Sequence, residues 1–172
     1  NIVIESDELS DIWLEAECGA VGTLWMTQQS ATASMGQYIT IAGGNNSTSS
    51  APSSSVGFAS YDFNVGISGL YTFWARVRAA TSNDDSFWVR MDGGSWYNWN
   101  GLTSSTEWIW DDCQSYSLSA GNHTLDIAYR EDGADLDKIY IGNFIPSGSG
   151  GAAPTCNTAG QATIHENETG FC

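Results

Sequence analysis

The chain has 172 residues, with 20 acidic side chains against five basic ones and a formal net charge of −15. This charge excludes nucleic acids and anionic membranes as partners, because their phosphates bind through Lys and Arg. It also argues against strongly anionic polysaccharides unless a metal ion mediates. The alternative is that the acids only keep the protein soluble. The length suits one domain with a full core, and the aromatic content of 12% argues against disorder.

Short runs in which apolar and polar residues alternate predict β-strands along most of the chain. In residues 70–79, for example, Tyr71, Phe73 and Val77 share one face and the arginines share the other. Turn-forming Gly, Asn and Asp separate the runs, and no segment has a helical apolar stripe. The pattern predicts an all-β fold, an antiparallel β-sandwich of the jelly-roll type. The expected strands are residues 13–18, 37–42, 56–65, 70–79, 87–92, 108–111, 122–130 and 136–144.

Composition and a weak internal repeat predict the domain organisation. Residues 1–11 are expected to be an N-terminal extension, 12–145 one module and 146–155 a flexible Gly/Ser linker. The E-x-E-x-G pattern that begins at Glu15 recurs at Glu166. A pattern that recurs behind a linker is typical of tandem modules, so residues 156–172 are interpreted as a tail that could begin a second, similar module.

The four cysteines allow three pairings. We favour Cys18–Cys113 within the module and Cys156–Cys172 in the tail, which could hardly order itself otherwise. The sequence has no C-x-x-C pair, which argues against a zinc site. An even count without metal spacing indicates an oxidising compartment, so we expect a secreted, extracellular protein.

Acidic residues in two predicted strands form the first candidate site. Glu15 and Glu17 are expected on one strand face about 7 Å apart, with Asp137 on another strand. Neighbouring carboxylates repel each other unless a cation lies between them, and hard oxygen ligands suit calcium. Solvated strand-edge acids are one alternative. A paired-carboxylate glycosidase is another, although two acids on one strand serve its chemistry poorly.

Aromatic residues in a glycine-flanked stretch form the second candidate site. Trp96, Tyr97 and Trp99 crowd this stretch, and Trp108 and Trp110 follow. Exposed rings can pack on the C–H faces of sugars while nearby polar groups bind the hydroxyls. Alternation places some of these rings in the core, so we expect about half of them to be exposed.

Three further features have less certain roles. The loop of residues 130–135 carries Arg130, Asp132 and Asp135, and it is either a binding loop or an ordinary hairpin turn. The pairs Trp74/Arg76 and Trp88/Arg90 predict a cation–π ladder if their strands are neighbours, or a weaker second sugar platform. His123 lies on an apolar strand face, so it is interpreted as a core residue and not as a catalytic base.

Three motifs together resemble the family 6 and family 35 group of carbohydrate-binding modules over residues 12–145. They are LEAE from Leu14, LSAGNHTL from Leu118 and LDKI from Leu136. The resemblance implies a β-sandwich with a structural Ca2+ held by Glu15, Glu17 and Asp137. It also implies a sugar cleft at one end of the sandwich, with Tyr38, Trp108 and Asp135 in the matching positions.

The sequence thus predicts a non-catalytic carbohydrate-binding module that tethers a secreted polysaccharide-degrading enzyme to a neutral plant or algal glycan. It is expected to be a monomer linked to other modules. A catalytic polysaccharide lyase or hydrolase domain and a cell-surface adhesion module are the alternatives. The residues expected to contact sugar are Tyr38, Trp96, Tyr97, Trp99, Trp108, Arg130, Asp132 and Asp135.

Overall fold

The computed structural model describes residues 9–156. The predicted repeat at residues 166–170 and Cys172 lie outside these residues, as does most of the predicted N-terminal extension. In the described part, eleven strands and three short 3-10 helices are present: β1 (Ile12–Glu15), η1 (Ala16–Cys18), β2 (Ala20–Val21), β3 (Trp25–Gln29), η2 (Ser34–Gly36), β4 (Gln37–Ile41), η3 (Ser55–Gly57), β5 (Phe58–Val65), β6 (Gly69–Ala79), β7 (Ser86–Met91), β8 (Tyr97–Asn100), β9 (Ser105–Leu118), β10 (Gly121–Tyr129) and β11 (Ala134–Gly142).

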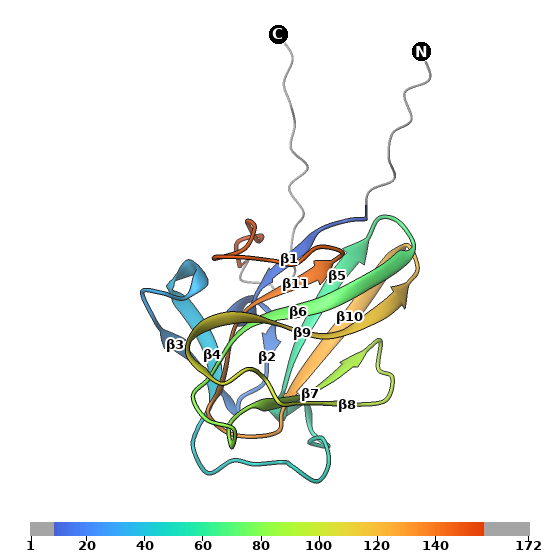
Figure 1. Ribbon diagram of the computed structural model, residues 1–172. Coiled ribbons are helices and arrows are strands. Elements are labelled where there is room, and N and C mark those ends of the chain that lie inside the picture. Colours follow the sequence, from blue (N-terminus) through green and yellow to red (C-terminus); the bar gives the residue numbers. More distant parts are fainter. Residues whose placement is uncertain (1–8, 157–172) are drawn as a thin grey trace, which may run out of the picture.

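The strands form two antiparallel sheets, which confirms the predicted β-sandwich (Figure 1). Sheet A has the order β3-β4-β11-β6-β9, and β1 also pairs with β11. Sheet B has the order β2-β5-β10-β7-β8. The first and last strands of the module are therefore neighbours, with Glu15 opposite Lys138. This pairing brings residues from both ends of the sequence together.

The core lies between the inner faces of the two sheets, and strand alternation determines which residues enter it. On β6, Tyr71, Phe73, Ala75 and Val77 are fully buried, while Thr72, Trp74 and Arg76, which alternate with them, lie on the opposite face of the strand. Phe87 of β7 and Leu125 of β10 bury their side chains from sheet B. Each such side chain contributes about 1.5–3 kcal/mol by leaving water, so this alternation stabilises the strand register.

Two predicted strands have different lengths in the structure. The strand expected at residues 13–18 ends at Glu15, because Ala16–Cys18 turn into the helix η1. The strand expected at residues 108–111 extends over the 14 residues of β9, which pairs with β6 along most of its length. The flanks of β9 are polar on their exposed side, so hydrophobic alternation does not reveal them. The short strands β2, β3 and β8 were not predicted.

The predicted cation–π ladder is wrong, because β6 and β7 belong to different sheets. Trp74 and Arg76 lie on sheet A, whereas Trp88 and Arg90 lie on sheet B. Each arginine instead stacks on another aromatic residue: Arg76 lies 5.7 Å from the ring centroid of Trp108 on β9, and Arg90 lies 4.3 Å from that of Trp96, just before β8.

Both predicted disulfides are wrong, because Cys18 is bonded to Cys156, with their Cα atoms 4.9 Å apart. Cys113, on β9, is half-buried and has no disulfide partner within residues 9–156, and burial raises the pKa of its thiol. The pairing differs because the C-terminal segment, residues 146–156, returns across the module toward η1. Cysteine spacing carries no information on such a return.

The C-terminal segment is held against sheet A and differs from the flexible linker that its composition predicts. Trp110 Nε1 donates to Gly148 O at 3.1 Å, and Lys138 Nζ donates to Gly151 O at 2.5 Å. A Cβ atom at Gly151 would lie 2.6 Å from the indole of Trp13, so only glycine permits this close approach.

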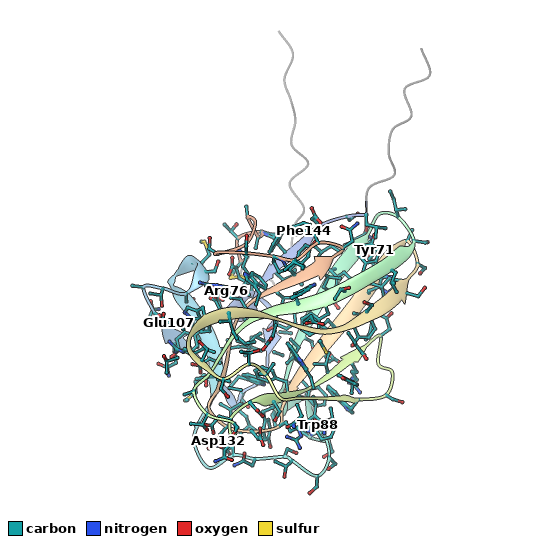
Figure 2. The ribbon with its side chains drawn as sticks, in the orientation of Figure 1. Tyr71, Arg76, Trp88, Glu107, Asp132 and Phe144 are labelled. Carbon is teal, nitrogen blue, oxygen red and sulfur yellow. A yellow bond between two sulfur atoms is a disulfide. The ribbon has the colours of Figure 1, made fainter. Side chains whose placement is uncertain are left out.

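Loops at the opposite end of the sandwich brace one another. Ser47, in the long loop between β4 and β5, donates its N–H to Arg130 O at 2.8 Å and accepts from Trp88 Nε1 at 2.8 Å. Gly44 N–H donates to the carboxylate of Asp132. Figure 2 shows Asp132 and Trp88 at this end and Phe144 at the other. Within residues 9–156, no helix is long and apolar enough to cross a membrane.

Candidate functional site

An aromatic site forms on the outer face of sheet A, where Tyr38 of β4 and Trp108 of β9 come together. Their ring centroids are 5.2 Å apart, at an interplanar angle of 67°. Both side chains are half-buried, so part of each ring faces solvent. Strand alternation produces this placement, because Ile39 and Val77 point into the core and their neighbours point out. We call Tyr38, Trp108, Arg78 and Asp135 the aromatic site.

Arg78 lies against both rings of the aromatic site. Its guanidinium carbon is 5.0 Å from the Tyr38 ring centroid and 4.5 Å from the Trp108 ring centroid. Asp135 holds the guanidinium in place by accepting bonds from Nε at 2.9 Å and Nη2 at 2.7 Å. Asp135 and Arg78 face each other across β11 and β6. The third nitrogen, Nη1, takes no part in these two bonds. Burial lowers the pKa of Arg78, but Asp135 and the Tyr38 side chain, which is close to the guanidinium, together raise that pKa above its usual value.

Sequence reasoning missed Arg78 as part of this site. The alternation of residues 70–79 puts Arg78 on the outer face of its strand, and this is the signal in the sequence that points to a surface role for Arg78. The sheet order β4-β11-β6-β9 decides which rings it meets, and this order depends on pairing between distant strands. The structure does bring Tyr38, Trp108 and Asp135 together, as the resemblance implied.

The predicted calcium ligands Glu15, Glu17 and Asp137 lie near one another at the junction of β1, η1 and β11, and we call them the acidic cluster. Glu15 is 3% exposed and Asp137 is fully buried, so the alternative of solvated strand-edge acids is wrong. Two cations partly balance the cluster. Lys138 Nζ is 3.2 Å from Glu15 Oε1, and Arg76 forms an ion pair with Asp137.

Two buried oxygens of the acidic cluster, Glu15 Oε2 and Glu17 Oε2, have no hydrogen-bond partner among residues 9–156. Burial raises the pKa of Glu17 to about 7, and the nearby carboxylates of Glu15 and Asp137 act in the same direction. Burial also raises the pKa of Asp137 to about 6 against the opposing effect of Arg76. Buried unpartnered carboxylate oxygens are what a hard cation would satisfy, so Glu15 and Glu17 fit a calcium ion.

Asp137 fits a calcium ion less well than the two glutamates. Its Oδ1 accepts the Ser34 N–H at 2.8 Å, and its Oδ2 accepts from Arg76. Glu17 also lies close to the sulfurs of Cys18 and Cys156. These sulfurs are joined in a disulfide and offer no thiolate to a metal.

The predicted aromatic cluster is divided among three environments. Trp99 is 6% exposed and packs in the core against Phe73 and Phe87, so its predicted role in sugar contact is wrong. Trp96 is half-buried on the outer face of sheet B, 5.0 Å from the Phe58 ring. Tyr97 is 41% exposed. Trp99 does not reach the surface because β8 pairs with β7 over the core, and strand alternation on β8 directs its side chain inward.

The predicted loop residues Arg130 and Asp132 lie apart from the rings of the aromatic site. Arg130 Nη1 donates to Ser86 Oγ at 2.8 Å and to Asn100 Oδ1 at 2.7 Å. Asp132 accepts from the backbone of Gly44, on the long loop. The contacts of Arg130 and Asp132 therefore hold neighbouring loops together. Of the predicted residues in the loop 130–135, only Asp135 belongs to the aromatic site.

His123 is 8% exposed, as expected of a core residue. Its Nδ1 is 2.7 Å from Asp92 Oδ2 and its Nε2 is 2.8 Å from Ser119 O. Burial disfavours the imidazolium, but these two acceptors together outweigh burial and raise the pKa of His123. Both ring nitrogens are engaged, so the side chain offers no free base to a substrate.

Every lysine and arginine of the sequence forms an ion pair with a carboxylate. The pairs are Arg76–Asp137, Arg78–Asp135, Arg90–Asp126, Arg130–Glu131 and Lys138–Glu15. An anionic ligand would therefore have to compete with an existing partner at each of these cations.

Comparison of the fold with solved structures gives matches that cover most of the chain. A family 35 carbohydrate-binding module from Clostridium thermocellum has a TM-score of 0.60 and 21% identity, over 76% of this chain and 98% of its own. The chain has the fold of a carbohydrate-binding module. A module from Cellvibrio mixtus lichenase 5A, solved with cellotriose, has a TM-score of 0.56 and 19% identity, over 80% of this chain and 99% of its own.

Larger proteins match over one part only. A GH26-CBM35 β-(1,4)-mannanase from Podospora anserina has a TM-score of 0.61 and 17% identity over 80% of this chain. The chain spans only 28% of the length of that mannanase. No family model matches the sequence, and no curated protein matches it significantly. At these identities the likeness establishes the fold.

Proposed function

We propose that this chain is a non-catalytic module that binds glycans at the aromatic site. The observation that carries the proposal is the meeting of Tyr38 and Trp108 at 5.2 Å, half-exposed, on a fold shared with carbohydrate-binding modules. Partly exposed rings offer apolar surface to the C–H faces of a sugar. The Arg78 guanidinium lies beside them, and its N–H groups can donate to hydroxyl oxygens.

The ligand class that fits best is a neutral glycan. All five basic side chains already have carboxylate partners, and the net charge is −15. A uronate would have to displace Asp135 from Arg78 and approach a negative surface. A neutral sugar needs only the ring faces and the Arg78 donor. Neutral plant and algal polymers, such as galactomannan and laminarin, are of this kind.

The biological role that we infer is tethering within a secreted, multimodular enzyme. A linked module raises the effective concentration of a catalytic domain at an insoluble polymer without forming any new contact with the reacting bond. The mannanase that shares the fold over part of its length supports this arrangement. The Cys18–Cys156 disulfide is consistent with an oxidising compartment.

Affinity gels provide the test of this function. The chain should be retarded in gels that contain hydroxyethylcellulose, galactomannan or laminarin, with at least one of the three neutral polymers effective. Alginate and polygalacturonate should leave its mobility unchanged when calcium is chelated. No retardation by any neutral polymer contradicts the proposal. Release of shorter sugars from a polymer would favour the lyase or hydrolase alternative instead.

We also propose that a calcium ion stabilises the acidic cluster. The unpartnered Glu15 Oε2 and Glu17 Oε2 would bind it, and Asp137 would lie at the edge of its coordination shell. The ion would neutralise the remaining negative charge between β1, η1 and β11. Because Arg76 lies between Asp137 and the Trp108 ring, the ion would support the fold and not touch the sugar.

Chelation should lower thermal stability. A ligand present at a hundred times its Kd stabilises the folded state by about 2.7 kcal/mol, and this corresponds to a fall in Tm of roughly 5–10 °C on adding EDTA. Differential scanning calorimetry with calcium and with EDTA measures the fall. Glu17→Gln should abolish most of the calcium dependence, whereas Glu107→Gln, at an exposed site on β9, should retain it. An unchanged wild-type Tm contradicts the calcium proposal.

A further inference from the structure

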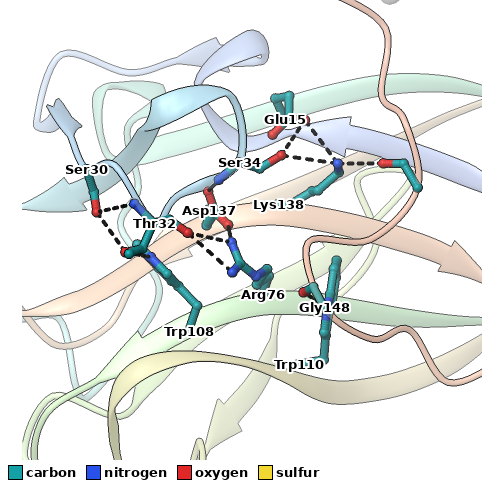
Figure 3. A network of polar contacts seen from close by, with 11 residues as sticks. Glu15, Ser30, Thr32, Ser34, Arg76, Trp108, Trp110, Asp137, Lys138 and Gly148 are labelled. Atoms are coloured by element: carbon teal, nitrogen blue, oxygen red, sulfur yellow. Dashed lines mark hydrogen bonds and ion pairs between the residues drawn. The ribbon is translucent and has the colours of Figure 1, made fainter.

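The loop between β3 and β4, residues 30–36, lies between the acidic cluster and the aromatic site. Figure 3 shows a continuous series of polar contacts from Glu15, through Ser34, Asp137, Arg76 and Thr32, to Trp108. We call residues 30–36 the connecting loop. It touches both candidate sites through side chains that neither site requires for its own chemistry.

At the aromatic site, Thr32 is the contact of the connecting loop. Trp108 Nε1 donates to Thr32 Oγ1 at 3.2 Å. The Thr32 hydroxyl also lies 3.1 Å from Ser30 Oγ, and both terminal nitrogens of Arg76 are 3.3 Å from Thr32 O. The threonine is therefore held through its backbone and side chain while its hydroxyl faces the indole of Trp108.

At the acidic cluster, Ser34 is the contact of the connecting loop. Its N–H donates to Asp137 Oδ1 at 2.8 Å, and its hydroxyl donates to Glu15 Oε1 at 2.9 Å. Lys138 Nζ donates to Ser34 Oγ at 3.2 Å. The next residue, Met35, has a φ of 51°, which is strained for a side chain of this kind. Strain persists where surrounding contacts over-determine a conformation, and the bonds of Ser34 do this.

We propose that Thr32 is a positioning residue for Trp108, and that Ser34 holds Thr32 in place by attaching the connecting loop to the acidic cluster. The proposal rests on the proposed glycan-binding function. A half-exposed tryptophan can rotate about its side-chain bonds, and a ring that must be fixed on binding loses affinity for that reason. A hydrogen bond from Nε1 fixes the face that the indole presents.

Two matched substitutions isolate the Thr32 hydroxyl. Thr32→Val keeps the shape and removes the acceptor, whereas Thr32→Ser keeps the hydroxyl. Thr32 is exposed, so neither change should disturb the core. The first measurement is the indole Nε1–H resonance of Trp108 in 15N-labelled protein without glycan, assigned with Trp108→Phe. The second is retardation in gels of hydroxyethylcellulose, galactomannan and laminarin.

The Trp108 indole resonance should move upfield in Thr32→Val and stay near its wild-type position in Thr32→Ser. The dissociation constant for the retarding polymer should rise about two- to tenfold in Thr32→Val, the effect of one lost hydrogen bond, and recover in Thr32→Ser. Ser34→Ala should move the same resonance in the same direction by a smaller amount, because the loop loses one of its attachments.

Three outcomes would overturn the proposal, and they can be told apart. If wild-type protein is retarded and Thr32→Val is retarded equally, Thr32 does not position Trp108, while the glycan-binding function stands. If Ser34→Ala leaves the indole resonance unchanged while Thr32→Val moves it, the Ser34 hydroxyl does not hold Thr32 in place, and this half of the proposal fails. If no polymer retards the wild type, the proposed function fails and this proposal fails with it.

Discussion

Replacing both Cys18 and Cys156 with serine is expected to lower the free energy of unfolding by about 2–5 kcal/mol. The two cysteines are 138 residues apart in sequence, so their bond closes almost the whole described chain into one loop. In the chain-entropy account, the stabilisation grows with the logarithm of loop length and reaches about 5 kcal/mol for a loop of this size. The corresponding fall in Tm is roughly 5–15 °C.

The double substitution should also have a local effect on the C-terminal segment. Without the disulfide, the hydrogen bonds from Trp110 to Gly148 and from Lys138 to Gly151 must hold the C-terminal segment alone. Exposure of Trp13 and Trp110 should then shift the tryptophan emission to longer wavelength. Calorimetry and fluorescence of the double variant measure both effects, and adding a reductant to wild-type protein should reproduce them.

Cys113→Ser is the matched control, because this half-buried cysteine forms no disulfide with another described residue. It should change the free energy of unfolding by less than about 1 kcal/mol, as substitutions away from key contacts do. If Cys113→Ser instead caused the large loss, the pairing Cys18–Cys113 expected from the sequence would be right and the structural pairing wrong. Non-reducing peptide mapping distinguishes the two pairings directly.

The fold could be predicted from the sequence because strand alternation is a local property. Tyr71, Phe73 and Val77 recur at every second position, and each is buried in the structure. A pattern with period two requires no knowledge of the partner strand, so a single sequence carries it.

The arrangement of the sites could be predicted only in part, because it depends on which strands become neighbours. Trp96, Trp99 and Trp108 are close in sequence, yet they lie on the outer face of sheet B, in the core and on the outer face of sheet A. Arg78 reaches the aromatic site through pairing with β11 and β9. The resemblance to known modules groups Tyr38, Trp108 and Asp135, which the structure brings together, whereas spacing alone gives no such grouping; their contact with sugar stays a prediction.

The electrostatics of the acidic cluster could likewise be predicted only in part from the sequence. The sequence places Glu15, Glu17 and Asp137 on two strands, which predicts repulsion that a cation would relieve. It does not reveal that Arg76, from a third strand, forms an ion pair with Asp137, or that Lys138 turns toward Glu15. Two buried oxygens remain unpartnered after these pairs form, so the cation that we propose has a smaller charge to balance than three free carboxylates would present.

Trp108→Ala should abolish most glycan binding, with the dissociation constant rising at least about thirtyfold. Truncating a central aromatic residue of a binding site commonly costs 2 kcal/mol or more. Here the ring packs against Tyr38 and Arg78, so its removal also frees both neighbours to move. The measurement is retardation in the affinity gel of whichever neutral polymer binds the wild-type chain.

Trp96→Ala is the matched control for this variant. Trp96 is also half-buried and also stacks on an arginine, with Arg90 4.3 Å from its ring centroid, but it lies on sheet B. Its removal should change stability by an amount similar to that of Trp108→Ala and leave retardation within about twofold of wild type. Equal losses in the two variants would mean that the glycan spans both faces. Loss in Trp96→Ala alone would move the binding site to sheet B and contradict the site proposed at Tyr38 and Trp108.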